Sequence, residues 1–200
     1  QSLYSYFGKK CISYPLSEAI ESGMLTPYYY YPILTFLDNR ELDEYLEITT
    51  QLAGAINYKN GKPILTDYAK QLLIKRSRVV AGAKDKINAL HKQIEPYVND
   101  KHILVYCGTT TNNDDEDINF GKRQIDIVSD LLGNTLNMRV GRFTSHEDIE
   151  ERIQIREAFA DGTSLQTLVA IKCLDEGVNI PSIKTAFILA SSTNPKEYIQ

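Results

Sequence analysis

A polar turn follows the apolar run 167–171 and contains side chains suited to binding. They are a lysine directly after the run, then a glutamate, a glycine, an asparagine and a proline: Lys172, Glu176, Gly177, Asn179 and Pro181. The apolar run has the length and composition of a buried strand. An ammonium group at a strand end is suited to binding phosphate, and the alternative is an exposed structural lysine.

The sequence after Asp100 alternates between strand patterns and helix patterns, which is typical of a parallel sheet with helical crossovers. The expected strands are 102–107, 138–143, 167–171 and 186–189, and the expected helices are 118–132, 146–160 and one that begins near Pro195. Ligands bind at the carboxyl ends of the strands in such sheets. The loops in which we expect a site are therefore 108–111, 144–145, 172–181 and 190–194.

The first hundred residues have a different pattern, which predicts a segment of strands and helices. We expect a short strand from Lys10 to Tyr14, a helix capped by Ser17 and a strand-forming run at 27–37. Apolar residues at helical spacing then predict a helix over 39–57, capped by Asp38 or Asn39 and ended by the sequence NGKP. A longer helical tract over 72–94 is closed by Pro96.

Four consecutive tyrosines, Tyr28 to Tyr31, lie in the strand-forming run. Aromatic rings in a row can form a platform on which bases stack. The alternative is that they pack on both faces of a strand, with Pro32 placing that strand at an edge or a bulge.

Composition and charge exclude several classes of protein. The 200 residues have a formal net charge of -4, which argues against bulk electrostatic coating of nucleic acid, so any DNA or RNA contact is local. No apolar run is long enough to span a membrane and no secretory signal is visible, so we expect a cytoplasmic protein without a membrane partner. The three cysteines are odd in number and widely spaced, which argues against disulfides and zinc sites.

Charge is unevenly distributed along the chain. A basic stretch contains seven lysines and arginines against the single Asp85: Lys70, Lys75, Arg76, Arg78, Lys84, Lys86 and Lys92. Such a stretch is typical of the solvated face of a helix. The acidic cluster 114–117 is typical of a solvated loop.

The motifs of several enzyme classes are missing from the sequence. It contains neither a GxxxxGK[ST] loop nor a GxGxxG turn, which excludes a self-sufficient P-loop ATPase and argues against a dinucleotide enzyme. His91, His102 and His146 lack the spacing of metal ligands, so we expect no metal site. Cys107 and Cys173 lie at the ends of apolar strands, where a small buried thiol is the usual explanation.

Five segments in order resemble the second RecA-like lobe of superfamily 2 helicases and translocases. They are HILVYCGTT, GRFTS, ERIQIREAFADG, TLVAIKCLDEGVNIP and AFILASSTNPKEYIQ. The chain is most similar to DEAD/DEAH-type enzymes that include restriction-enzyme motor subunits. The resemblance implies a RecA-like three-layer α/β domain at 79–200, preceded by an interlobe segment of strands and helices at 1–78.

The resemblance also implies roles for individual residues. Contacts to the nucleic-acid backbone are implied for the residues in matching strand-end loops: Thr109, Thr110, Thr144, Ser145 and Lys172. Hydroxyl groups suit this task because they bind phosphate without reading base sequence. Gly177 matches a glycine that allows close approach to the nucleotide, and Asn179 occupies a position near the ribose where relatives commonly carry aspartate. Phe159 is expected in the core, and Arg152 is expected to brace its helix.

The resemblance further implies how ATP with Mg²⁺ is used. In the intact enzyme they bind between two lobes, with Mg²⁺ held mainly by the first. The final residues match the start of motif VI, whose catalytic arginines follow Gln200, so no catalytic residue is expected in this chain. Because an arginine finger contributes on the order of 10³ or more in rate, we expect these 200 residues alone to be inactive.

The sequence therefore predicts the C-terminal lobe of an ATP-dependent DNA helicase or translocase, with RNA as an alternative substrate. Its expected partners are its own N-terminal RecA-like lobe, DNA and the subunits of a restriction or defence system. Two alternatives remain open at this stage. One is a nucleic-acid-binding module without motor activity, and the other is an unrelated nucleotide-sugar or small-molecule enzyme on a similar sheet.

Overall fold

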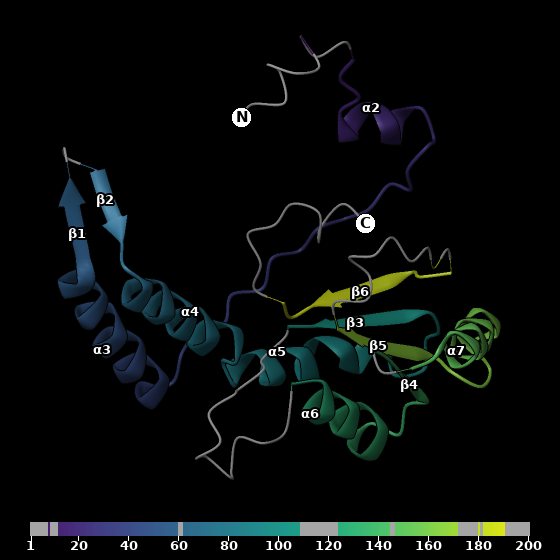
Figure 1. Cartoon of the computed structure of the whole chain (residues 1–200). Helices are drawn as coiled ribbons and strands as arrows, with labels where there is room; N and C mark the ends of the chain where they lie inside the picture. The colour runs from purple at the N-terminus through teal and green to yellow at the C-terminus, as the bar shows by residue number, and fades with distance from the viewer. Residues whose placement is uncertain are drawn as a thin grey trace. The chain divides into compact units, whose positions relative to one another are not determined.

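The structure is a computed structural model that describes residues 8, 12–59, 62–108, 124–144, 147–171, 180 and 182–190. The chain forms two compact units, residues 1–34 and 35–200, which are described separately. The helices and strands are shown in chain order in Figure 1.

The first unit contains the short helix α2 (Leu16–Glu21). The residue before it is Pro15, which has no side-chain hydrogen bond to the helix, so the prediction of a Ser17 cap is wrong. Residues 12–14 are not in a strand, and the expected strand-forming run at 27–37 is irregular. Its tyrosines Tyr28 to Tyr31 are exposed instead of packed on two faces. Pro27 and Pro32 have no backbone N–H groups to donate to a sheet, which disfavours strand pairing there.

The second unit begins with a pair of helices joined by a β-hairpin. Helix α3 (Asn39–Ala55) has Asp38 as its cap, one of the two caps that the sequence predicts. Asp38 and Glu41 form a capping box by exchanging side-chain-to-backbone hydrogen bonds. Strands β1 (Ile56–Lys59) and β2 (Lys62–Leu65) pair antiparallel, and helix α4 (Asp67–Ala81) follows with Thr66 as its cap. The two helices share a small core made of Ile48, Leu52, Ala69 and Leu72.

The hairpin was not predicted from the sequence, and the helical spacing over 72–94 predicted one continuous tract. That tract is two helices, α4 and α5 (Asp85–Ile94), because α4 ends at Gly82, whose N–H donates to the carbonyl of Arg78 at 2.8 Å. Helix α5 passes into the short 3₁₀-helix η1 (Glu95–Tyr97), which contains Pro96 in its first turn. The predicted end of the tract at Pro96 is therefore confirmed.

A four-stranded parallel sheet forms the centre of the second unit. Its strands are β3 (Ile103–Cys107), β4 (Val140–Phe143), β5 (Thr167–Ile171) and β6 (Thr185–Ile188), in the order β4-β5-β3-β6. In the parallel register Cys107 lies opposite Ile171, and Phe143 lies opposite Ala170. The carboxyl ends of these strands therefore lie at one edge of the sheet, which we call the carboxyl edge.

Helices cover both faces of this sheet, as Figure 1 shows. On one face, α5 and α6 (Gln124–Asp130) bury Leu90, Ile94 and Val128 against Val105 and Val169. Helix α6 continues as a π-helical turn, η2 (Leu131–Thr135). On the other face, α7 (Ile149–Asp161) buries Phe159 against a cluster that includes Leu104, Phe143 and Leu168. The predicted three-layer α/β fold and the core position of Phe159 are confirmed.

Helix α7 has well-defined ends. It begins with a capping box between Asp148 and Glu151, and it ends at Gly162, which has a left-handed backbone with φ 66°. A Cβ atom on Gly162 would lie 2.9 Å from Nε2 of His102 and 2.9 Å from Cδ of Lys101. The left-handed backbone therefore favours glycine at this position, and a Cβ would also force the side chains of His102 and Lys101 to shift.

We predict that Gly162→Ala destabilises the fold by about 1–2 kcal/mol, because alanine disfavours the left-handed conformation. Urea denaturation of wild type and variant measures this difference. Gly133→Ala is the matched control, since a Cβ there meets nothing within 4 Å and φ is not positive. Equal free energies of unfolding for Gly162→Ala and wild type would contradict the assignment.

Candidate functional site

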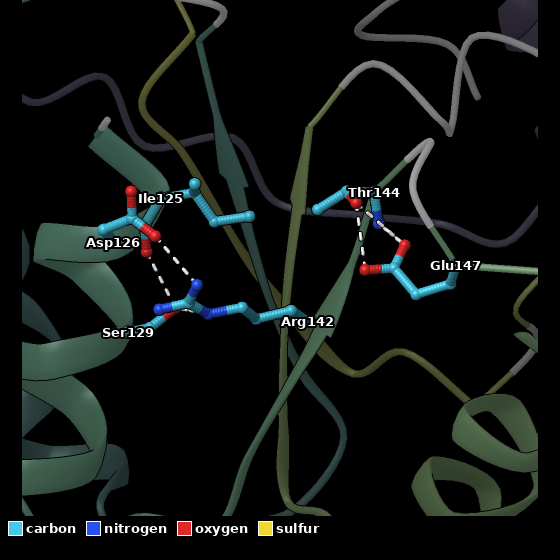
Figure 2. Close-up of polar contacts among 6 residues, drawn as sticks. All are labelled: Ile125, Asp126, Ser129, Arg142, Thr144 and Glu147. Atoms are coloured by element: carbon cyan, nitrogen blue, oxygen red, sulfur yellow. Dashed lines mark hydrogen bonds and ion pairs between the residues drawn. The ribbon is translucent and has the colours of Figure 1, made fainter. Parts of the chain in front are cut away.

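The end of β4 carries the one predicted site residue that lies within the described part of the chain, Thr144. Its backbone N–H donates to Oε2 of Glu147 at 2.6 Å, and its hydroxyl donates to the same carboxylate at 2.9 Å (Figure 2). A carboxylate is an anion with two acceptor oxygens, so this strand end presents N–H and O–H donors that hold an anion. A phosphate oxygen offers the same acceptor chemistry.

Arg152 reaches this strand end from α7. Its Nη2 donates to the carbonyl of Thr144 at 3.0 Å, and its guanidinium lies 5.7 Å from the centre of the Phe143 ring. Arg152 therefore fixes the end of β4 to α7 through a hydrogen bond and a cation–π contact. The interpretation of Arg152 as a bracing residue is confirmed.

The sequence analysis missed Glu147, although a signal was present. Thr144 and Glu147 have the T-x-x-E spacing of a capping box, in which the glutamate side chain accepts from the backbone of the earlier residue. Here Glu147 accepts from both the backbone and the hydroxyl of Thr144. To bind a phosphate, Thr144 must therefore exchange the Glu147 carboxylate for a phosphate oxygen.

The end of β3 is held by a buried amide. The N–H of Gly108 donates to Oε1 of Gln124 at 2.8 Å, and Nε2 of Gln124 donates to the carbonyl of Ala81 at 3.2 Å. One side chain therefore links three elements, namely β3, α6 and the last residue of α4. Nothing in the sequence indicated Gln124, because its partners are 16 and 43 residues away.

Lys86 provides a second link at the same place. Its Nζ donates to the carbonyl of Ala81 at 3.3 Å and to the carbonyl of Leu189, directly after β6, at 3.1 Å. Partial burial lowers the pKa of Lys86, because leaving water disfavours the charged ammonium. Gln124 and Lys86 together hold the end of α4 against the ends of β3 and β6.

Arg142 attaches the edge strand β4 to α6. Its Nη1 forms an ion pair with Asp126 at 2.7 Å, and its Nε donates to the hydroxyl of Ser129 at 3.1 Å (Figure 2). Ser129 in turn donates to the carbonyl of Ile125 at 2.7 Å. This arrangement fixes the position of β4, and with it the position of Thr144 at the carboxyl edge.

The other predicted site residues lie outside the described residues: Thr109, Thr110, Ser145, Lys172, Gly177 and Asn179. The strands that precede them are described. Residue 109 follows β3, 145 follows β4 and 172 follows β5, and these strands are neighbours that run in the same direction.

Cys107 is the last residue of β3 and is buried. Burial raises the pKa of its thiol to about 12, so the thiol stays protonated at neutral pH. The interpretation of Cys107 as a small buried thiol is confirmed. Cys173, for which the sequence also predicts a buried thiol, lies outside the described residues.

Two of the three histidines lie in the described part of the chain. Nε2 of His91 on α5 lies 3.9 Å from Oε1 of Glu95, the first residue of η1. Nε2 of His102 donates to the carbonyl of Ala160 at 3.1 Å, and its ring packs edge-on against Phe159. Among the described residues, no group of three His, Cys, Asp or Glu side chains is placed to hold a metal ion.

Comparison with known protein families identifies the family to which this chain belongs. The profile described as "Helicase conserved C-terminal domain" matches residues 85–200, a match that begins at the first residue of α5. The chain belongs to the helicase C-terminal domain family. The predicted resemblance to the second lobe of superfamily 2 helicases is thereby confirmed. A search of curated proteins gave no match.

Three solved structures are similar to this helicase C-terminal domain to different degrees. The Sulfolobus solfataricus SWI2/SNF2 ATPase C-terminal domain has a TM-score of 0.59 at 15% identity, covering 78% of this chain and 69% of that one. The C-terminal part of the Fun30 ATPase domain has a TM-score of 0.45 at 16% identity, covering 83% and 57%. The Pyrococcus furiosus Hef helicase domain has a TM-score of 0.36 at 18% identity, covering 72% and 29%. The first of these supports the fold assignment.

None of the helices in the described part of this helicase C-terminal domain is long and apolar enough to cross a membrane.

We predict that Gln124→Leu destabilises the domain by about 1–3 kcal/mol, because the Gly108 N–H loses its partner and the Ala81 carbonyl keeps only its hydrogen bond from Lys86. The free energy of unfolding in urea measures this effect. Gln93→Leu, at an exposed position on α5, is the matched control and is expected to change stability by less than about 0.5 kcal/mol. Equal effects of the two substitutions would show that the Gln124 bridge is dispensable.

Proposed function

We propose that this chain is the second RecA-like lobe of an ATP-dependent DNA helicase or translocase that acts in a restriction or defence system. In this proposal the lobe comprises residues 79–200, and residues 1–78 form the segment that leads into it. Membership of the helicase C-terminal domain family supports the proposal, and so does the single carboxyl edge at which four parallel strands end. The family match also argues against an unrelated small-molecule enzyme.

The observation that carries the proposal is the donor arrangement at Thr144. A backbone N–H and a hydroxyl at the end of β4 together hold one carboxylate, that of Glu147. Groups that hold an anion through N–H and O–H donors bind a phosphate backbone without reading its sequence. In the proposal, Thr109, Thr110, Ser145 and Lys172 contribute to the same nucleic-acid track, which is suited to stepping along any sequence.

The same edge is proposed as one wall of an ATP site between two lobes. Gly177 and Asn179 would lie beside the nucleotide, the glycine through its small size and the asparagine through its amide. Bound ATP with Mg²⁺ supplies the free energy of hydrolysis, and we propose that the first lobe holds most of the Mg²⁺ ligands. The role of this lobe's own residues is to approach the nucleotide and to grip the backbone while the lobes close and reopen.

Substitution in the intact enzyme tests the nucleotide wall. Gly177→Leu is expected to reduce DNA-stimulated ATPase activity by on the order of tenfold or more, because a large side chain blocks the close approach. Gly54→Leu, on the exposed surface of α3 where a Cβ meets nothing within 4 Å, is the control. Unchanged ATPase activity in Gly177→Leu would remove this residue from the site.

Binding measurements test the nucleic-acid track separately. Thr144→Val in the intact enzyme is expected to raise the Kd for DNA about two- to tenfold, as loss of one hydrogen bond worth about 0.5–1.5 kcal/mol implies. Thr50→Val, whose hydroxyl donates to the carbonyl of Leu46 on α3, is the matched control. An enzyme that binds DNA tightly but never hydrolyses ATP would support the non-motor binding module instead.

A further inference from the structure

The helical pair α3 and α4 has an uneven distribution of charge. Helix α3 carries one arginine against four acidic residues: Arg40, Glu41, Asp43, Glu44 and Glu47. Helix α4 carries four basic residues against one acidic residue: Asp67, Lys70, Lys75, Arg76 and Arg78. The positive charge of the pair is therefore concentrated on α4.

Three of the cations lie on the outer side of α4. Lys70, Ile74 and Arg78 are spaced by four residues and share one face, with Lys75 beside them. Lys70 and Lys75 are exposed, Ile74 is 51% exposed and Arg78 is half-buried. Arg76 points elsewhere, since its guanidinium lies 5.4 Å from the centre of the Tyr45 ring of α3. We call Lys70, Lys75 and Arg78 the α4 basic face.

The α4 basic face is largely unneutralised. Lys70 pairs with Asp67 at 2.8 Å, but both side chains are well exposed, so water screens this pair. Lys75 and Arg78 have no ion-pair partner among the described residues. Because the whole chain has a net charge of -4, a polyanion is attracted only where positive charge is concentrated locally, as it is on this face.

Helix α4 is firmly attached to the carboxyl edge. Its last carbonyl, that of Ala81, accepts hydrogen bonds from Lys86 and from Gln124. Lys86 also binds the carbonyl that follows β6, and Gln124 binds the N–H that follows β3. The α4 basic face therefore begins close to the proposed nucleic-acid track and extends away from it.

We propose that the α4 basic face binds the phosphate backbone of duplex DNA next to the strand held at the carboxyl edge. The eight-residue separation of Lys70 and Arg78 corresponds to about 12 Å along a helix. Each strand of B-DNA carries one phosphate per roughly 3.4 Å of axis, so the face matches a run of about three or four phosphates. This proposal rests on the proposed function and adds a second contact surface that the family motifs do not include.

The test is salt-dependent binding of a labelled DNA duplex of mixed sequence by the full 200-residue chain. The triple variant Lys70→Gln, Lys75→Gln, Arg78→Gln is expected to weaken binding at low salt by on the order of tenfold. It is also expected to make the negative slope of the log binding constant against the log salt concentration shallower by about three units, because each lost phosphate contact removes about one unit. Circular dichroism and a thermal melt verify that the variant is folded.

The matched control neutralises two lysines and one arginine near the opposite edge of the sheet, Lys92, Lys101 and Arg139, each to Gln. All three are exposed, and Lys101 and Arg139 precede β3 and β4. Binding by this control triple is expected to match wild type within about twofold at low salt. Equal salt slopes for the two triple variants would overturn the proposal, and so would an absence of duplex binding by the wild-type chain.

Failure of this proposal is distinguishable from failure of the proposed function. If Gly177→Leu and Thr144→Val impair the intact enzyme while the α4 triple variant binds DNA like wild type, only the α4 basic face is wrong. If ATPase activity of the intact enzyme is absent or does not respond to DNA, the proposed motor function is wrong. Duplex binding that depends on the α4 basic face would stand in that case as a property of a binding module.

Discussion

The parallel register of four strands is the constraint on which the rest of the structure depends. Strand β5 lies between β4 and β3, and β3 also pairs with β6, with every pairing parallel. Parallel strands need crossover connections, and helices α6 and α7 lie in the connections from β3 to β4 and from β4 to β5, so that these strands end at the same edge. Segments that are far apart in the sequence, such as those that follow Phe143, Ile171 and Cys107, therefore follow strand ends that are neighbours in space.

Side chains from several elements then hold that edge in place. Gln124 and Lys86 attach the end of α4 to the ends of β3 and β6, while Arg152 and Arg142 fix β4 to α7 and α6. Their partners are mostly backbone carbonyls and N–H groups, which cannot move without moving a strand or a helix. These contacts hold the carboxyl edge in one arrangement, which is what the proposed nucleic-acid track requires.

The sheet could be predicted from the sequence chiefly because its central strands, β3 and β5, are continuous apolar runs buried on both faces. Strand β5 was predicted with the bounds it has, and β3 within one residue.

The β-hairpin was not predicted, although Asn60-Gly61 is a strong hairpin signal, because the sequence on either side has the spacing of a helix. The prediction of a strand-forming run around Tyr28 to Tyr31 was wrong. Residues of high strand propensity form a strand only where a partner strand pairs with them, and the sequence does not show such a partner. At the site, Thr144 was named correctly as a strand-end residue, but its partner Glu147 and the bridge through Gln124 depend on tertiary contacts.

Hydrogen exchange of the intact enzyme tests the central claim, that the carboxyl edge faces both ligands, most directly. With DNA and a non-hydrolysable ATP analogue, the account predicts slower exchange in peptides covering 108–112, 144–148 and 172–181. Peptides covering the opposite strand ends, 99–103, 136–140 and 163–167, are predicted to exchange as before. Protection confined to those opposite ends, or no change at the carboxyl edge, would contradict the account.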